Sequence, residues 1–273
     1  PVEQPDAVTD GVTRDVPQLP DDGFDYYLFE LKFRGSFAHV KESLRHHVQH
    51  FLGHTNVIDL GCGRGEFLEL LSEQGVPARG VDINPDMVAV CRARGLDVVQ
   101  MDVFEFLMRQ EENSLGGIFS AHLVEHLHPE DLVRFIDLCY QKLKVDAPLV
   151  IETPNPMCLL AMSTHFLLDP THVRPVHPEV LRFLLDAAGF GPVNIMLSAP
   201  TPEELRLRRI PTSEAMSPEE RTRFEVLNAN IDRLNEFLYG YQNYAVVTHK
   251  MYWPARHNRQ VFRANTTIVQ HQD

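Results

Sequence analysis

The sequence predicts a doubly wound α/β fold, and three observations carry that prediction. Short apolar runs alternate with amphipathic stretches from residue 56 to residue 198, as in repeated strand–helix units. The first run, VIDL, leads into a glycine-rich loop, GCGRG, that opens an amphipathic stretch. Apolar residues make up 44% of the 273-residue chain, which is enough for the core of one large domain.

The predicted elements run from an N-terminal helix to a final strand. A mostly helical pattern extends from Tyr26 to about Leu52. Strands are then expected at 56–60, 78–82, 97–101, 116–121, 147–152, 192–198 and 244–250. Helices are expected at 65–74, 85–94, 103–110, 129–143, 156–166 and 178–188. A long helix is expected at 217–240, where Ser217 can act as N-cap and Pro218 occupies the first helical position.

Composition divides the chain into an arm, one domain and a tail. Residues 1–24 are rich in proline and acidic residues and predict a flexible arm. One domain is expected at 25–250, with a helical insertion at about 203–240. Residues 251–273 show no clear pattern and are expected to form a C-terminal tail.

Charge and cysteine content argue against several classes of protein. With 25 Lys and Arg against 38 Asp and Glu, the net charge is −13, unlike that of a general nucleic-acid binder. The four cysteines contain no CxxC pair, so neither a disulfide framework nor a structural zinc site is expected. No apolar run reaches the ~18 residues of a transmembrane helix, and no signal-peptide pattern opens the chain. We therefore expect a cytoplasmic protein without a membrane span.

The glycine loop lies where a doubly wound sheet binds its ligand, at the carboxyl end of the first strand. Gly61, Gly63 and Gly65 give GxGxG spacing, whereas a dinucleotide needs GxGxxG with its pyrophosphate on the helix N-terminus. The position of the third dinucleotide glycine holds Glu66, and Asp59 precedes the loop. Two carboxylates repel a pyrophosphate but suit a ligand with a cationic centre. S-adenosylmethionine, a sulfonium without phosphate, fits this requirement.

The next two strands end in acidic residues, at positions where such residues can bind a nucleoside. Asp82 lies 21 residues after Gly61, where an acid accepts hydrogen bonds from ribose hydroxyls, and Ile83 could flank the adenine. Asp102, followed by Val103, ends the third strand, where it can meet the adenine amino group. The alternative is that the glycines only form a tight strand–helix turn, but the acids at the three strand ends favour a ligand.

These segments resemble, in order, the motifs of class I S-adenosylmethionine-dependent methyltransferases. The matching segments are VIDLGCGRGEFLELL, GVDINPDMV, Asp102 and IFSAHLVEHLHPEDL, and the resemblance covers roughly residues 55–200. It implies a seven-stranded, Rossmann-like, mostly parallel sheet whose last strand is antiparallel. It also implies S-adenosylmethionine over the glycines, with ribose on Asp82 and adenine near Asp102, and S-adenosylhomocysteine as product. In such enzymes the residues after the fourth strand, here Ala121 and His122, contact the methionine part.

Candidate catalytic groups follow the fourth and later strands, because an oxygen acceptor needs a general base there. His172 is the first choice for the base, with Asp169 to orient it, and His126 is a second candidate beside Glu125. The alternative for Glu125 and His126 is that they brace the loop by hydrogen bonds.

Four further residues are candidates for binding the acceptor, namely Glu152, Asn155, Arg174 and His177. Glu152 leaves an apolar strand toward the ligand edge, and Asn155 shapes the turn that follows. Arg174 could hold a carboxylate or phosphate of the substrate. The alternatives are that Asn155 is structural and that Asp169 and His177 cap the helix at 178–188.

A metal is possible but not expected. His122, Glu125, His126, Asp169 and His172 are suitable ligand types, but His122 and His126 fall in a strand-to-helix loop rather than on one helix face. His46, His50 and His54 recur every four residues and are expected to share a partly exposed helix face, without an acidic partner.

The segments RGEFLELL, VEHL, ETPNP and LDPTHVRPVHPE also resemble a narrower group, bacterial methyltransferases associated with glycosyltransferases in surface-polysaccharide biosynthesis. This resemblance implies O-methylation of a sugar or glycan hydroxyl, with a possible homodimer or a fusion to a glycosyltransferase. The alternatives are a methyltransferase for a non-sugar small molecule, a catalytically silent S-adenosylmethionine-binding protein, and a NAD-dependent oxidoreductase, which Glu66 disfavours.

Overall fold

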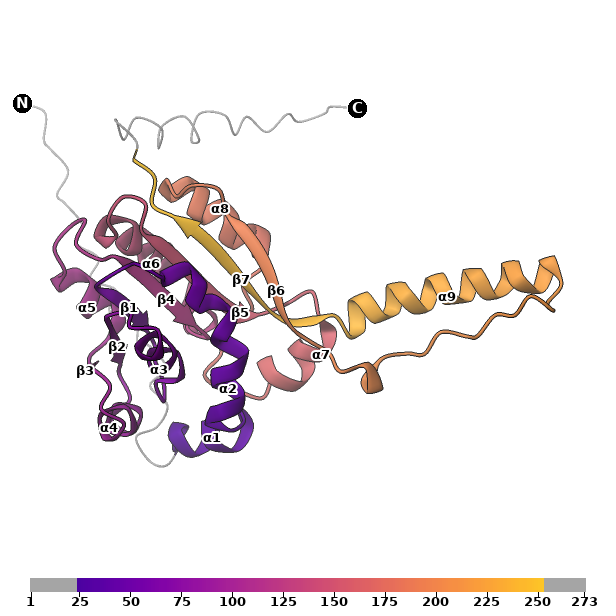
Figure 1. Ribbon diagram of the computed structural model, residues 1–273, viewed down its shortest axis with the longest axis horizontal. Coiled ribbons are helices and arrows are strands. Elements are labelled where there is room, and N and C mark those ends of the chain that lie inside the picture. Colours follow the sequence, from indigo (N-terminus) through magenta and orange to yellow (C-terminus); the bar gives the residue numbers. More distant parts are fainter. Residues whose placement is uncertain (1–23, 253–273) are drawn as a thin grey trace, which may run out of the picture. The chain divides into compact units, whose positions relative to one another are not determined.

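The computed structural model describes residues 24–252 and contains a seven-stranded sheet (Figure 1). The strand order is β3-β2-β1-β4-β5-β7-β6. The strands are β1 (Val57–Leu60), β2 (Ala78–Asp82), β3 (Val98–Gln100), β4 (Gly117–Ala121), β5 (Pro148–Pro154), β6 (Asn194–Pro200) and β7 (Tyr241–His249). The last strand pairs antiparallel with both β5 and β6, and the strands from β3 to β5 pair parallel. This confirms the predicted doubly wound α/β class with an antiparallel last strand.

The helices that connect the strands also agree with the predicted pattern. They are α3 (Glu66–Glu73), α4 (Pro85–Ala93), α5 (Val103–Arg109), α6 (Pro129–Lys142) and α8 (Pro178–Ala188). A 3₁₀ turn, η2 (Val124–His126), follows β4. None of the helices in residues 24–252 is long and apolar enough to cross a membrane.

Two predicted helices are wrong in detail. The pattern at 26–52 is three elements: α1 (Tyr26–Phe33), α2 (Phe37–Leu44) and the 3₁₀ helix η1 (Arg45–Phe51). Gly35, in the left-handed region at φ 96°, interrupts the first, and the histidine-rich stretch that forms η1 has weak α-helix propensity. The helix predicted at 156–166 is a single turn, α7 (Leu159–Ala161), followed by the π-helical turn η3 (Met162–Phe166).

Two hydrophobic cores lie on the two faces of the sheet, because successive strand residues point to opposite sides. Leu149 and Ile151 of β5 belong to a core shared with α5, α6 and α8. Val150, between them, belongs to the other core, shared with α2, η1 and α3. Glu152 therefore points to the same face as Val150, the face that η1 covers.

The insertion between β6 and β7 contains a short 3₁₀ turn, η4 (Glu203–Leu205), and the long helix α9 (Pro218–Leu238), which begins at a capping box on Ser217. The extended segment before α9 runs alongside this helix (Figure 1). Two buried asparagines of α9 hold the segment in place. The side-chain amide of Asn228 bonds both backbone groups of Ile210, and that of Asn235 bonds both backbone groups of Leu207.

The described residues fall into two compact units, which are divided between Ser36 and Phe37. In the first unit, Arg34 pairs with Glu30 one helical turn earlier. The predicted flexible arm (1–24) and C-terminal tail (251–273) lie outside the described residues, except for Phe24, Met251 and Tyr252.

Candidate active site

The glycine loop between β1 and α3 has backbone geometry that only glycine adopts readily. Gly61, Gly63 and Gly65 have φ values of 73°, 52° and 85°, in the left-handed region. A Cβ on Gly65 would lie 2.5 Å from the Leu96 side chain and 2.9 Å from the sulfur of Cys91, so the third glycine also allows close packing. The loop thus presents bare backbone at the carboxyl edge of the sheet, where a ligand of this fold class binds.

Asp82 ends β2 directly beside this loop. Its carboxylate accepts hydrogen bonds from the backbone N–H of Gly63, at 2.8 Å, and of Asn84, at 2.9 Å. The acid predicted to bind ribose is therefore also part of what holds the loop in place. Ile83, next to it, is 66% exposed, as a side chain that covers one face of a ligand ring would be.

The other predicted cofactor residues differ in their surroundings. Asp102 is the N-cap of α5 and accepts from the backbone N–H groups of Phe104 and Glu105, with Val103 buried beside it. Asp59 is buried within β1.

Glu66 is buried at the start of α3 and pairs with buried Arg64 at 2.7 Å. The guanidinium of Arg64 balances the charge of this carboxylate, so the predicted repulsion of a pyrophosphate cannot come from Glu66 alone.

The end of β4 bends sharply into the turn that carries the predicted catalytic residues. Ala121 is buried, and His122 has a positive φ of 56°, an uncommon value for a residue other than glycine. The His122 backbone N–H donates to the carbonyl oxygen of Glu152 on β5. This geometry turns the His122 imidazole toward two carboxylates. Its Nδ1 lies 3.2 Å from Oε1 of Glu125, and its Nε2 lies 3.9 Å from Oε1 of Glu152.

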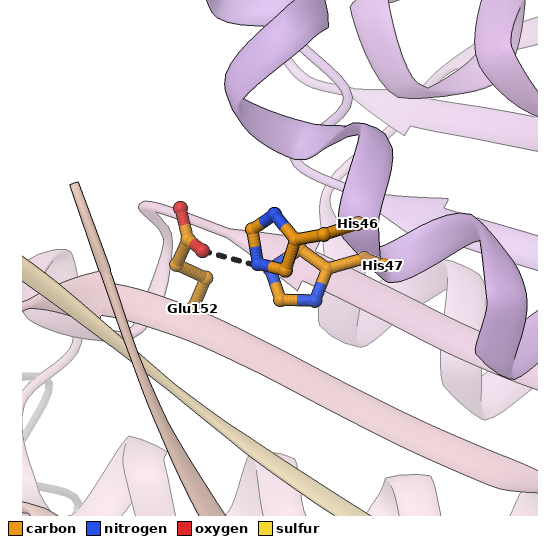
Figure 2. A group of neighbouring side chains, drawn as sticks. All are labelled: His46, His47 and Glu152. Carbon is orange, nitrogen blue, oxygen red and sulfur yellow. Dashed lines mark hydrogen bonds and ion pairs between the residues drawn. The ribbon is translucent and has the colours of Figure 1, made fainter.

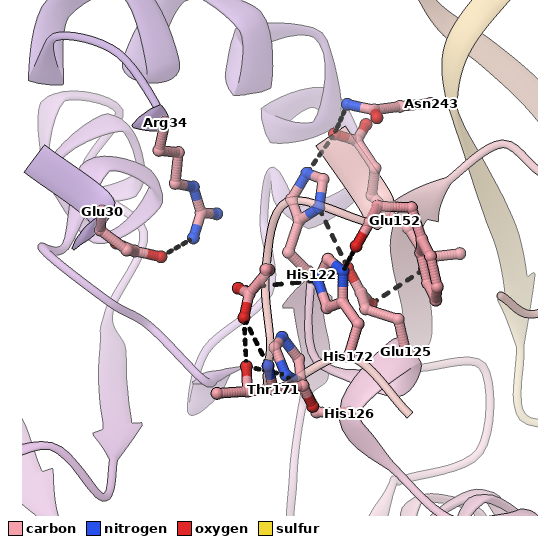
Figure 3. Close-up of polar contacts among 12 residues, drawn as sticks. Glu30, Arg34, His122, Glu125, His126, Glu152, Thr171, His172 and Asn243 are labelled. Atoms are coloured by element: carbon pink, nitrogen blue, oxygen red, sulfur yellow. Dashed lines mark hydrogen bonds and ion pairs between the residues drawn. The ribbon is translucent and has the colours of Figure 1, made fainter. Parts of the chain in front are cut away.

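Glu125 is the centre of the polar network in Figure 3. It is fully buried, and its Oε2 accepts a hydrogen bond from the Thr153 hydroxyl at 2.9 Å. Burial alone would raise the pKa of the Glu125 carboxyl, but the hydrogen bond from His122 and the charges of His122 and His126 outweigh it and hold the pKa at about 2. Glu125 is therefore an anion at neutral pH, surrounded by imidazoles.

The segment 169–177, which contains Pro170 and Pro175, brings His172 to this anion. The backbone N–H of Val173 donates to the carbonyl oxygen of Glu125, and the Tyr244 hydroxyl donates to the carbonyl oxygen of Val176. His172 Nδ1 lies 2.7 Å from the carbonyl oxygen of Phe166, which requires an N–H on that nitrogen. Its Nε2 lies 4.0 Å from Oε1 of Glu125 and 3.8 Å from Oδ2 of Asp169, and it is the nitrogen that carries the lone pair in the neutral form of this tautomer.

His126 and Asp169 complete this side of the network through Thr171. His126 Nδ1 lies 2.9 Å from the Thr171 hydroxyl and 3.3 Å from its carbonyl oxygen. The hydroxyl in turn donates to Asp169 at 2.6 Å. The rings of His126 and His172 lie 4.7 Å apart, and burial lowers the pKa of His126. All four predicted catalytic residues are thus brought together.

Sequence reasoning missed one member of the network, His47. It is fully buried on η1, and its Nε2 lies 2.7 Å from Oε2 of Glu152, which also accepts from the Ser198 hydroxyl (Figure 2). Burial would raise the pKa of Glu152, but the His47 hydrogen bond and the nearby imidazole charges lower it. The expectation that the histidine-rich stretch lacks an acidic partner is therefore wrong.

The remaining predicted acceptor residues have mixed positions. Asn155 is buried and bonds the backbone of Tyr241 and Met157, which shapes the turn after β5. His177 is exposed and accepts from the backbone N–H of Glu179 as N-cap of α8. The Nε of Arg174 is buried with no hydrogen-bond partner among the described residues.

Comparison with known proteins identifies the family. A family model described as a methyltransferase domain matches residues 19–195, and the order of strands and the glycine loop agree with it. The structure of an S-adenosylmethionine-dependent methyltransferase from Archaeoglobus fulgidus is 44% identical, covers 82% of this chain and 99% of its own, and superposes with a TM-score of 0.77. The chain belongs to the S-adenosylmethionine-dependent methyltransferases. The glycine loop and the acids at the ends of β1, β2 and β3 fit this cofactor.

More distant relatives share only part of the molecule. A ubiquinone biosynthesis O-methyltransferase of Xylella fastidiosa is 29% identical over 109 residues, 38% of this chain and 44% of that protein. A probable S-adenosylmethionine-dependent methyltransferase of Mycolicibacterium smegmatis is 26% identical over 137 residues, 50% of this chain and 51% of its own. The chain thus spans about half the length of these curated relatives. The phosphoethanolamine N-methyltransferase 2 of Haemonchus contortus with S-adenosylmethionine, 15% identical with a TM-score of 0.55, shares the fold.

Proposed function

We propose that this methyltransferase transfers the methyl group to a hydroxyl oxygen of a sugar or glycan. The observation that carries the proposal is the position of His172 Nε2, 4.0 Å from the buried Glu125 anion at the end of β4. An imidazole beside a fixed carboxylate can act as a general base, and O-methylation needs one because a sugar hydroxyl is a weak nucleophile when protonated. Glu125 and Asp169 stabilise the imidazolium that forms.

The chemistry of the step is a displacement at carbon. S-adenosylmethionine supplies a methyl group on a positively charged sulfur, so the O–CH₃ bond forms while the S–CH₃ bond breaks and a neutral thioether leaves. The hydroxyl proton passes to His172 Nε2. Among the cofactor residues we assign the loop glycines and Asp59 to the methionine end together with Ala121 and His122, Asp82 to the ribose, and Ile83, Asp102 and Val103 to the adenine.

Polar residues along the acceptor edge support a hydrophilic acceptor. Glu152 and Asn243 of neighbouring strands lie beside His122, and the buried Nε of Arg174 is a donor suited to a sugar oxygen or to a phosphate that follows the sugar. From the likeness of the motif series, we also propose that the protein acts together with a glycosyltransferase, as a separate chain or fused to it.

A second acceptor class, phenolic hydroxyls, is favoured by one observation. The O-methyltransferase of ubiquinone biosynthesis matches this chain over the 109 residues of its most similar segment. The network described above serves either acceptor, because both reactions remove a proton from oxygen.

Binding and turnover test the proposal in two stages. Calorimetric titration with S-adenosylhomocysteine, with NAD as control, measures the cofactor site. Turnover is then measured by mass spectrometry with S-adenosylmethionine and three panels: nucleotide sugars and glycans, polyhydroxylated phenols, and primary amines. Methylation of a sugar panel member, with a mass gain on oxygen, is expected. Methylation of the amines alone would refute O-methylation, and methylation of the phenols alone would replace the sugar by the second acceptor class.

A further inference from the structure

Two groups of ligand-type side chains lie in the described part of the chain: Glu125 with His126 and His172, and Glu152 with His46 and His47. In each group, one ligand atom from every residue lies within 4.8 Å of the others. We propose that Glu125, His126 and His172 bind one divalent transition-metal cation, of the class of Mn²⁺, Co²⁺ or Zn²⁺, beside the acceptor hydroxyl. The inference rests on the proposed O-methylation for the role of the cation, and it gives His172 the role of a metal ligand in place of that of a base.

The first argument is the orientation of the two imidazoles. A metal-bound histidine usually donates its other ring N–H to a backbone carbonyl or a carboxylate, which fixes the ring. His172 Nδ1 faces the carbonyl oxygen of Phe166 at 2.7 Å, and His126 Nδ1 faces the carbonyl oxygen and hydroxyl of Thr171. Nε2 is therefore the ligating nitrogen of both rings.

The second argument is the carboxylate. Glu125 is fully buried, and Thr153 holds its Oε2 at 2.9 Å, which directs Oε1 toward the imidazoles. Oε1 lies 4.0 Å from His172 Nε2 and 3.2 Å from His122 Nδ1, so the cation shares this oxygen with His122. A cation ~2.1 Å from each donor needs donors about 3 to 3.5 Å apart, so a small closure of the side chains completes the site. Two imidazoles and one carboxylate on a single side of an ion leave further positions for an acceptor oxygen.

The second group lacks these supports. His47 Nε2 already bonds Glu152 at 2.7 Å, and its Nδ1 is buried without a hydrogen-bond partner among the described residues. The rings of His46 and His47 pack against each other, with centroids 3.8 Å apart (Figure 2). The two rings are tilted by 43° to each other, and His47 Nε2 is already committed to the Glu152 carboxylate. We therefore assign the cation to the first group and hydrogen bonding to the second.

The cation changes how the proton leaves. It occupies the Nε2 lone pair of His172, so the acceptor hydroxyl binds the cation directly and loses its proton to solvent water. The resulting oxygen anion forms the O–CH₃ bond as the S–CH₃ bond breaks. The inference therefore replaces the base role of His172 by a ligand role, and EDTA distinguishes the two.

The experiment uses cobalt as a visible probe. The full chain is stripped with EDTA, dialysed and titrated with CoCl₂, and its visible absorption is recorded. One equivalent of Co²⁺ is expected to bind, with the band lost in His126→Gln and in His172→Gln. The band is expected to persist in His46→Ala, which alters the second group, and in His165→Ala, which removes an exposed histidine of η3. No band in the wild type, a band that survives both glutamine variants, or a band lost in His46→Ala would overturn the assignment.

Two further measurements keep the inference open to refutation if a variant does not fold. X-ray absorption of the wild-type cobalt protein should report two imidazole ligands, and fewer would overturn the site. Turnover should fall at least ~10-fold in EDTA and return with Mn²⁺ or Co²⁺. Full turnover in EDTA without cobalt binding would refute the cation site and support His172 as the general base. Cobalt binding with no methylation of any hydroxyl would support the cation site and refute the proposed function.

Discussion

The two halves of the sheet edge are built in different ways. Around β1, β2 and β3 the site consists of a short loop and the side chains that directly follow each strand, such as Asp82 and Asp102. Around β4 and β5 it consists of imidazoles and carboxylates drawn from four segments, and His47 reaches Glu152 across 105 residues of sequence. The cofactor half is thus encoded locally, and the acceptor half depends on the completed fold.

This difference has a physical cause. A cofactor recognised by backbone groups needs glycine at fixed places, and glycine conformations are a local property. An ionised group in a buried site needs a partner, whichever element supplies it, because an unpaired buried charge is costly. Glu125 and Glu152 are each held by groups from different segments, so a change in one segment is felt in another.

The largest effect is expected from His172→Ala. Whether Nε2 acts as base or as metal ligand, its loss should lower turnover by about 10²- to 10⁴-fold, as for other general bases. The affinity for S-adenosylhomocysteine should stay within about threefold of wild type, because His172 is not among the residues that we assign to that molecule. Turnover is measured by product mass and affinity by calorimetry.

The matched control is His165→Ala. His165 is exposed on η3 and bonds the Gln242 side chain, so its loss should alter neither quantity. Equal loss of cofactor affinity and turnover in His172→Ala would show that the two halves do not act independently and would contradict the comparison.

Asp82→Ala should have the next largest effect, on the cofactor half alone. It removes the carboxylate that we assign to the ribose, and also the hydrogen bonds that hold Gly63 and Asn84. Charge-assisted hydrogen bonds contribute about 1.5 to 3 kcal/mol, so affinity for S-adenosylhomocysteine should fall ~10- to 100-fold. Asp97→Ala, an exposed residue paired with Arg79, is the control. Unchanged affinity in Asp82→Ala would rule out the ribose assignment.

The same contrast explains what sequence reasoning could reach. It predicted the strands and the glycine loop, because apolar periodicity and glycine spacing are read along the chain, and the family resemblance implied the antiparallel last strand. It placed Glu125, His126, Asp169 and His172 as candidates, since all four lie in two short polar segments. It missed the His47–Glu152 pair, because no local pattern links residues 105 positions apart. One signal was available: a glutamate inside an apolar strand requires a buried partner.

Lowering the pH should reveal how much Glu152, in the acceptor half, contributes to the free energy of unfolding. The folded-state pKa of Glu152 is lowered, so its stabilising effect is complete above the unfolded-state pKa near 4.5 and is lost as the pH falls below that value. Glu152→Gln removes this titration. Between pH 5 and pH 3 its free energy of unfolding should therefore fall by about 1 to 3 kcal/mol less than that of the wild type. Urea unfolding at several pH values gives the free energies.

Glu112→Gln is the control for this experiment, because Glu112 is exposed between α5 and β4. It should follow the wild-type pH dependence. A wild-type dependence in Glu152→Gln as well would mean that Glu152 does not titrate differently in the folded and unfolded protein.

The smallest effect is expected from Glu66→Gln, which tests whether one charge chooses the cofactor class. The substitution breaks the buried pair with Arg64 but leaves the GxGxG spacing and the packing of Gly65 against Leu96. We expect no binding of NAD in calorimetry and continued binding of S-adenosylhomocysteine by the same preparation. NAD binding with a Kd below about 1 mM, or about −4 kcal/mol, would show that Glu66 itself excludes the pyrophosphate. Without such binding, exclusion lies in the backbone path of the GxGxG loop or in the Asp59 carboxylate, both of which the substitution leaves in place.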